Sequence, residues 1–124
     1  MPKTVAEKLQ IKPGSRVFWG DSIDERRDLI APLPDGATGT DAPDDADVAV
    51  VFIDDRAALE RLVEWPIAVL GGVRAVWIVY PKGGRSDVNR DIVWRRVAEA
   101  AWRLVSNVSV DDTWSAVRAK PLGG

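Results

Sequence analysis

Four short polar segments of the sequence could carry chemistry. Each one follows a run of residues typical of a β-strand or links two such runs, and together they supply carboxylates, a lysine, paired glycines and a tryptophan. The segments are Gly20-Asp21-Ser22, Asp54-Asp55, Pro81-Lys82-Gly83-Gly84 and Asp111-Asp112-Thr113-Trp114. A lysine beside carboxylates can bind an anion, and a glycine pair lets backbone amides approach a phosphate or carboxylate. The candidate ligand-binding residues are therefore Asp21, Asp54, Lys82, Gly83, Asp111, Asp112 and Trp114. No residue is assigned a catalytic role.

Each candidate also has a purely structural interpretation. Aspartate is a leading residue at helix starts, so Asp54-Asp55 and Asp21 can be helix caps. Asp111-Asp112 suits a tight turn, because aspartate tolerates turn backbone angles. The glycine pair after Lys82 fits a solvated loop, and Trp114 fits the rim of a core.

The absence of cysteine and histidine limits the reactions and metal sites that the chain could support. The chain has no cysteine and no histidine, which excludes disulfides, thiolate nucleophiles, serine–histidine–aspartate triads and zinc sites built on sulfur or imidazole. Acid–base work would fall to Asp, Glu, Lys or Tyr. The acidic loop of Asp41, Asp44, Asp45 and Asp47 does not have the spacing of a calcium-binding loop, so we expect no metal site.

Strand and helix patterns alternate along the chain. Thr4 and Glu7 have capping-box spacing and predict a helix over 5–10, and Ser22 and Glu25 predict a second helix towards Ile30. Further helices are predicted over 56–65 after Asp54-Asp55, and over 88–101 with Asp87 as its cap. The predicted strands are 16–19, a short one at 37–40, 47–53, 74–80, and a hairpin of 103–109 and 113–119.

This alternation predicts one α/β domain over residues 1–124. The two most apolar runs, 47–53 and 74–80, are typical of strands buried on both faces. We expect a three-layer Rossmann-like sheet, mostly parallel with a C-terminal antiparallel hairpin, and helices on both faces. In such sheets ligands bind outside the carboxyl ends of the strands, where the four polar segments would lie.

Charge and composition bear on partners and location. The net charge of −2 and the scatter of the arginines, such as Arg26-Arg27, Arg85 and Arg95-Arg96, argue against nucleic-acid binding. No stretch is apolar enough to span a membrane, and the N-terminus carries no signal peptide, which predicts a cytoplasmic protein. The six tryptophans mostly suit the core, but exposure of Trp65 and Trp94 would favour a homodimer.

Several segments resemble known families. The turn Lys12-Pro13-Gly14-Ser15, the strand 47–52 and the Gly71-Gly72 turn with its following strand resemble class I S-adenosylmethionine-dependent methyltransferases. The plan covers nearly the whole chain, with one strand–helix unit missing after the second strand. The resemblance implies a cofactor site after the first strand and makes Asp41 the counterpart of the ribose-binding acid. The family's glycine-rich loop is represented by Gly20 alone, however, so we expect no bound cofactor.

A second resemblance involves the ends and the middle of the chain. Residues 6–14, Tyr80-Pro81-Lys82 and 108–116 are similar to a family of small bacterial proteins without an assigned function. This resemblance implies a methyltransferase-like fold and no activity. The sequence thus favours a non-catalytic Rossmann-like module that binds a partner or a small ligand at the carboxyl edge. The alternative is a minimal methyltransferase-related enzyme that uses S-adenosylmethionine.

Overall fold

The computed structural model describes residues 4–20, 28–30, 32–64, 69–82 and 87–122. Six strands form one sheet in the order β2-β1-β3-β4-β6-β5. The strands are β1 (Arg16–Phe18), β2 (Thr38–Thr40), β3 (Val48–Phe52), β4 (Ala75–Pro81), β5 (Trp102–Ser109) and β6 (Trp114–Pro121). Pairings among β1 to β4 are parallel, and β6 is antiparallel to both β4 and β5. The expected mixed sheet with a C-terminal hairpin is confirmed.

The two central strands are buried on both faces. Every residue of β3 and β4 is buried, because both strands consist almost entirely of apolar side chains and helices or loops cover both faces of the sheet. Alternate residues point to opposite faces. Val48, Val50 and Phe52 of β3 therefore join one hydrophobic cluster, whereas Ala49 and Val51 join the other.

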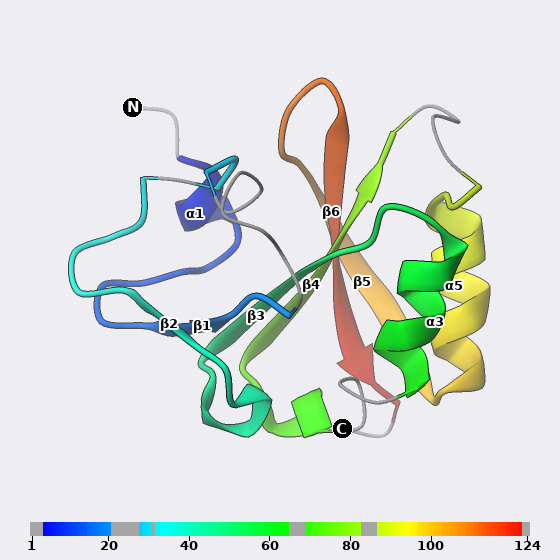
Figure 1. Cartoon of the computed structure of the whole chain (residues 1–124), viewed down its shortest axis with the longest axis horizontal. Coiled ribbons are helices and arrows are strands. Elements are labelled where there is room, and N and C mark those ends of the chain that lie inside the picture. The colour runs from blue at the N-terminus through cyan, green and yellow to red at the C-terminus, as the bar shows by residue number, and fades with distance from the viewer. Residues whose placement is uncertain (1–3, 21–27, 31, 65–68, 83–86, 123–124) are drawn as a thin grey trace.

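One face is covered by α1 (Val5–Lys8) and the segment that contains Ile30 (Figure 1). The predicted capping box is present, since the Thr4 hydroxyl accepts a hydrogen bond from the Glu7 amide. Trp77 belongs to the hydrophobic cluster on this face, which we call the α1-side cluster, and 1% of its surface is exposed. Its indole Nε1 donates to the carbonyl oxygen of Leu9 at 2.8 Å, which fastens the end of α1 to β4.

The opposite face is covered by α3 (Arg56–Glu64) and α5 (Arg90–Glu99), which lie side by side in Figure 1. Leu59 and Leu62 of α3, with Val93 and Val97 of α5, pack against the sheet because they recur at helical spacing. The Arg96 guanidinium donates from Nε to both carboxylate oxygens of Glu60, at 2.8 and 2.7 Å. This hydrogen bonding raises the pKa of Arg96 above its ordinary value.

Two short 3₁₀ turns, Pro43–Asp45 and Leu70–Gly72, precede β3 and β4. The short β2 confirms the strand predicted at 37–40, and α3 begins where Asp55 Oδ1 accepts a hydrogen bond from the amide of Ala58.

The predicted cap of the last helix was wrong: Asn89 accepts from Ile92 at the start of α5, whereas Asp87 accepts from the amide of Arg56 and so serves α3. Asn89 immediately precedes α5, so its side-chain oxygen can reach the amide of Ile92, the third residue of the helix. Asp87 lies two residues further from the helix.

Two predicted helices differ from the elements that the structure describes. The helix expected over 5–10 ends at Lys8, because Gln10 has a positive φ of 65° that a helix cannot accommodate. The helix expected from Ser22 falls mainly on residues outside the described part, and residues 28–30 form a turn. Among the described residues, no helix is long and apolar enough to cross a membrane.

Candidate functional site

The carboxyl edge of the sheet has a step. Phe18 at the end of β1 pairs with Thr40 at the end of β2 and with Ala49 of β3, so β3 continues to Phe52 past the ends of β1 and β2. At about 3.3 Å per residue, this stagger is about 10 Å. The chain also reverses direction across the sheet here, because β2 lies on one side of β1 and β3 on the other. Ligands of open α/β sheets bind at such a switch point.

Two residues follow the strand ends on the lower level of this step. Gly20 follows β1 with a φ of 64°, a left-handed conformation that favours glycine. A Cβ atom at this position would lie 3.4 Å from Cγ1 of Val51 on β3, so the backbone of Gly20 approaches the wall that β3 forms. Asp41 follows β2 immediately, on the neighbouring strand, and is exposed. The step therefore combines a closely approaching backbone with an exposed carboxylate.

Lys82, which the sequence proposed as a ligand-binding residue, follows β4 at the hairpin end of the carboxyl edge. Its ammonium donates to Ser109 Oγ at 2.7 Å and to the carbonyl oxygen of Asp111 at 2.6 Å, and its amide donates to the carbonyl oxygen of Thr113. Lys82 thus ties the end of β4 to the hairpin turn. Its ammonium is engaged by two oxygen atoms of the protein.

The two aspartates of the turn differ. Asp111 Oδ1 accepts hydrogen bonds from the amides of Thr113 and Trp114 at 2.8 and 2.7 Å, which is the pattern of an Asx turn. Asp112 is exposed, and its side chain makes no hydrogen bond or ion pair with the described residues. The turn interpretation of this pair therefore accounts for Asp111 and leaves Asp112 facing solvent.

The remaining candidates have different surroundings. Trp114 is half-buried, and its ring meets Phe52 of β3 edge-on with centroids 5.4 Å apart, so it packs on the α1-side cluster. Asp54 follows β3 and is exposed beside Asp55, the residue that caps α3. Asp21 and Gly83 lie outside the described residues. The structure thus brings Lys82, Asp111 and Trp114 together at the hairpin end of the edge.

A small polar cluster lies next to Lys82 on the face that α3 and α5 cover. The hydroxyls of Tyr80 and Ser115 both donate to Asn107 Oδ1 at 3.3 Å, and Tyr80 and Ser115 are buried. Sequence reasoning overlooked Asn107, which falls in the middle of a strand. Strand register places Asn107 here, because it pairs with Val117, two residues along β5 from the pair Ser109–Ser115. Its role here is to satisfy two buried hydroxyls.

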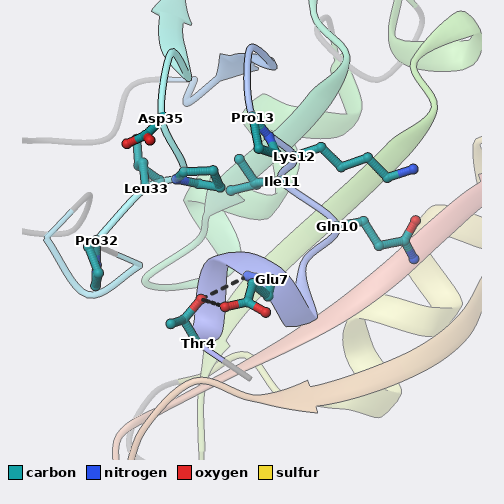
Figure 2. A pocket seen from close by; sticks show the side chains of 10 residues that line it. Thr4, Glu7, Gln10, Ile11, Lys12, Pro13, Pro32, Leu33 and Asp35 are labelled. Atoms are coloured by element: carbon teal, nitrogen blue, oxygen red, sulfur yellow. Dashed lines mark hydrogen bonds between the residues drawn. The ribbon is translucent and has the colours of Figure 1, made fainter. Parts of the chain in front are cut away.

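A separate cavity of about 780 Å³ lies beside α1 (Figure 2). Thr4 and Glu7 form one side, and the segment from Pro32 to Asp35 forms another, with Ile11 between them. None of the predicted site residues lines it. Lys12-Pro13 precedes β1 and Pro34-Asp35 precedes β2, so the cavity is set towards the amino ends of these strands. The one sequence signal was the recurrence of proline at 13, 32 and 34.

Within the described part of the chain, no three carboxylates gather in a way that could hold a metal ion.

No family model matches the sequence, and no curated protein matches it. The comparisons that bear on this chain are therefore structural.

Several solved structures have similar folds. A Rossmann-superfamily protein from Streptococcus agalactiae matches with a TM-score of 0.61 at 10% identity, covering 98% of this chain and 69% of its own. A proposed tRNA (m1A22) methyltransferase from Streptococcus pneumoniae matches at 0.56 and 7% identity, covering 98% and 71%. A release-factor-specific protein-(glutamine-N5) methyltransferase from Alicyclobacillus acidocaldarius matches at 0.50 and 19% identity, covering 98% and 95%. These identities show the fold alone: the chain has the Rossmann-like α/β fold that these methyltransferases share.

Proposed function

We propose that this chain is a non-catalytic Rossmann-like module that binds a small nucleoside-like ligand at the step of the carboxyl edge. The observation that carries the proposal is the position of Gly20 and Asp41 at the ends of two paired strands, beside the longer β3. A carboxylate next to closely approaching backbone suits the hydroxyl groups of a ribose, because the carboxylate accepts hydrogen bonds from both.

The non-catalytic part of the proposal is supported by how the other polar groups are used. The Lys82 ammonium, the Asp111 carboxylate and the Tyr80 hydroxyl all make hydrogen bonds that hold the hairpin. A general acid or base has to be available to the substrate. Groups bound into a turn in this way are better suited to shaping a site than to moving protons in it.

The alternative is a minimal methyltransferase that uses S-adenosylmethionine. One structural neighbour was solved in complex with that compound, at 8% identity. In this chain Asp41 suits the ribose of such a cofactor, whereas the methionine part requires further glycines after β1, and residues 21–30 contain none. The residues therefore fit the nucleoside half of the cofactor and not its amino-acid half.

The test is a thermal-shift titration with adenosine, S-adenosylhomocysteine and S-adenosylmethionine. At a hundred times its dissociation constant, a ligand adds about 2.7 kcal/mol, which should raise Tm by roughly 10 °C. Asp41→Asn should lose most of this rise. Asp44→Asn, which removes an equally exposed carboxylate from the 3₁₀ turn, should keep it.

Two results would separate the alternatives. Equal shifts for the wild type and Asp41→Asn, or no shift with any nucleoside, would remove the proposed site. Transfer of a labelled methyl group from S-adenosylmethionine to components of a cell extract, above the level given by heat-denatured protein, would favour the enzyme instead.

A further inference from the structure

One face of the C-terminal hairpin carries only basic charge. Arg103 of β5 and Lys120 of β6 are direct cross-strand partners, so their side chains leave the same face of the sheet. Arg118 lies two residues before Lys120 and therefore shares that face. Its partner on β4 is Trp77, which belongs to the α1-side cluster, so this is the face opposite α3 and α5.

A fourth cation joins these three from the residue before β4. Arg74 donates from Nη2 to the carbonyl oxygen of Gln10 at 3.0 Å, which holds it on the α1 side. Arg118 in turn donates from Nη2 to the carbonyl oxygen of Arg74 at 2.9 Å. We refer to Arg74, Arg103, Arg118 and Lys120 together as the basic face.

The basic face has no counter-charge within the described protein. None of its four residues forms an ion pair there, whereas Arg96 on the opposite side pairs with both Glu60 and Glu99. The Nε atom of Arg118 is buried, and no described residue offers it a hydrogen-bond acceptor. The chain contains 19 acidic residues against 17 basic ones, so acidic side chains are not scarce.

This arrangement works against folding. Like charges directly opposite each other on paired strands are destabilising, and Arg103 and Lys120 are such a pair. A buried donor without an acceptor, as at Arg118, adds to the cost. Unfavourable features that persist in a protein are concentrated at functional sites. Here the unfavourable feature is positive charge without a negatively charged partner, which a bound anion would supply.

The geometry indicates the shape of the anion. Cross-strand neighbours are about 5 Å apart, and residues two apart on one strand are about 7 Å apart. The charges are thus distributed over an open sheet face, and the cavity described above is lined by none of them. A single small anion would engage only part of such a surface, whereas a chain of phosphates would engage all of it.

We propose that the basic face binds the phosphodiester backbone of a single nucleic-acid strand, without reading its sequence. The basic face presents guanidinium and ammonium groups, which contact phosphates, and phosphate contacts carry no information about base sequence. The net charge of −2 does not oppose this, because phosphates respond to the charge of the local surface. The site is on a different part of the fold from the proposed nucleoside site.

The experiment measures the binding of a fluorescein-labelled oligouridylate by fluorescence anisotropy, between about 50 and 200 mM NaCl. The variant is Arg103→Gln/Lys120→Gln. The matched control is Arg61→Gln/Arg95→Gln, which removes the same charge from exposed positions on α3 and α5, on the opposite face. Neither pair makes a side-chain hydrogen bond or ion pair in the described protein, so both variants should fold, as circular dichroism would verify.

Four phosphate contacts give a slope of about −2.8 for the logarithm of the binding constant against the logarithm of salt concentration. The Arg103→Gln/Lys120→Gln protein should have a slope of about −1.4, because two contacts are lost, and the control should keep the wild-type slope. Equal slopes for the two variants would overturn the proposal, as would undetectable binding by the wild-type protein at the lowest salt concentration.

Discussion

The ammonium group of Lys82 lies 2.6 Å from the carbonyl oxygen of Asp111, so the end of β4 and the turn of the β5–β6 hairpin are joined through one side chain. The same turn is held from within by the Asp111 carboxylate, which accepts hydrogen bonds from Thr113 and Trp114. This corner of the carboxyl edge is therefore built by interactions internal to the protein. Substitutions at this corner should therefore lower the stability of the protein without changing ligand binding at the ends of β1 and β2.

Asp111→Ala should lower the stability of the protein by about 1 kcal/mol, because two amides lose their acceptor at an exposed turn. Asp112→Ala should change it by less than about 0.5 kcal/mol, as is usual for an exposed side chain with no partner among the described residues. Urea denaturation of the two variants measures the difference. Equal losses would mean that the turn is held in another way.

Lys82→Met should lower the free energy of unfolding by about 1 kcal/mol, since it removes the bonds to Ser109 and Asp111 while keeping the aliphatic stem. It should leave the dissociation constant for adenosine unchanged, because the step at Gly20 and Asp41 does not include it. Lys12→Met is the control, as the Lys12 ammonium has no partner among the described residues. Weaker adenosine binding by Lys82→Met would extend the site to the hairpin.

Gly20→Ala should cost about 1 kcal/mol, because a residue with a Cβ atom is strained at a φ of 64°. The new methyl group would also meet Val51 at 3.4 Å. Gly72→Ala offers a fair comparison, since nothing lies within 4 Å of its Cβ position and its φ is not positive. Thermal melts of both should show a lower Tm for Gly20→Ala alone; matching melts would mean that the strain at Gly20 is negligible.

Two tryptophans provide a contrast in burial. Trp77→Phe should cost about 2 kcal/mol, since the carbonyl oxygen of Leu9 loses its donor inside the core and the smaller ring leaves space. Trp94→Phe should change stability by less than about 0.5 kcal/mol, because Trp94 is 51% exposed on α5. Guanidinium denaturation of both variants tests this ranking, and a smaller loss at Trp77 than at Trp94 would contradict it.

The buried strands could be predicted from the sequence because their signal is local. β3 and β4 are runs of apolar residues that neither a solvated loop nor a one-sided strand would contain. The capping pair Thr4–Glu7 is also local, and it marked the start of α1 correctly. Asp87 shows the limit: its side chain serves the Arg56 amide 31 residues away, and no spacing rule of the helix next to it could reveal that.

The candidate site depends on register, which the sequence does not specify. That β1 and β2 end together, with β3 continuing past them, decides that Gly20 and Asp41 share one level of the edge. Similarly, Arg103 and Lys120 are far apart in the chain and become partners only through the pairing of β5 with β6. Lys82 was recognised as a polar residue at the edge, but its bonds to the hairpin turn could only come from the structure.

The proposed nucleoside site lies where β1 and β2 end. Its most direct test is a ¹H–¹⁵N correlation spectrum of the labelled protein, titrated with adenosine and S-adenosylhomocysteine. We expect saturable shifts centred on the amides of Gly20, Thr40 and Asp41, extending to Val51 on the adjacent β3. Shifts centred instead on the hairpin turn or on the cavity beside α1, or a spectrum that does not change, would contradict it.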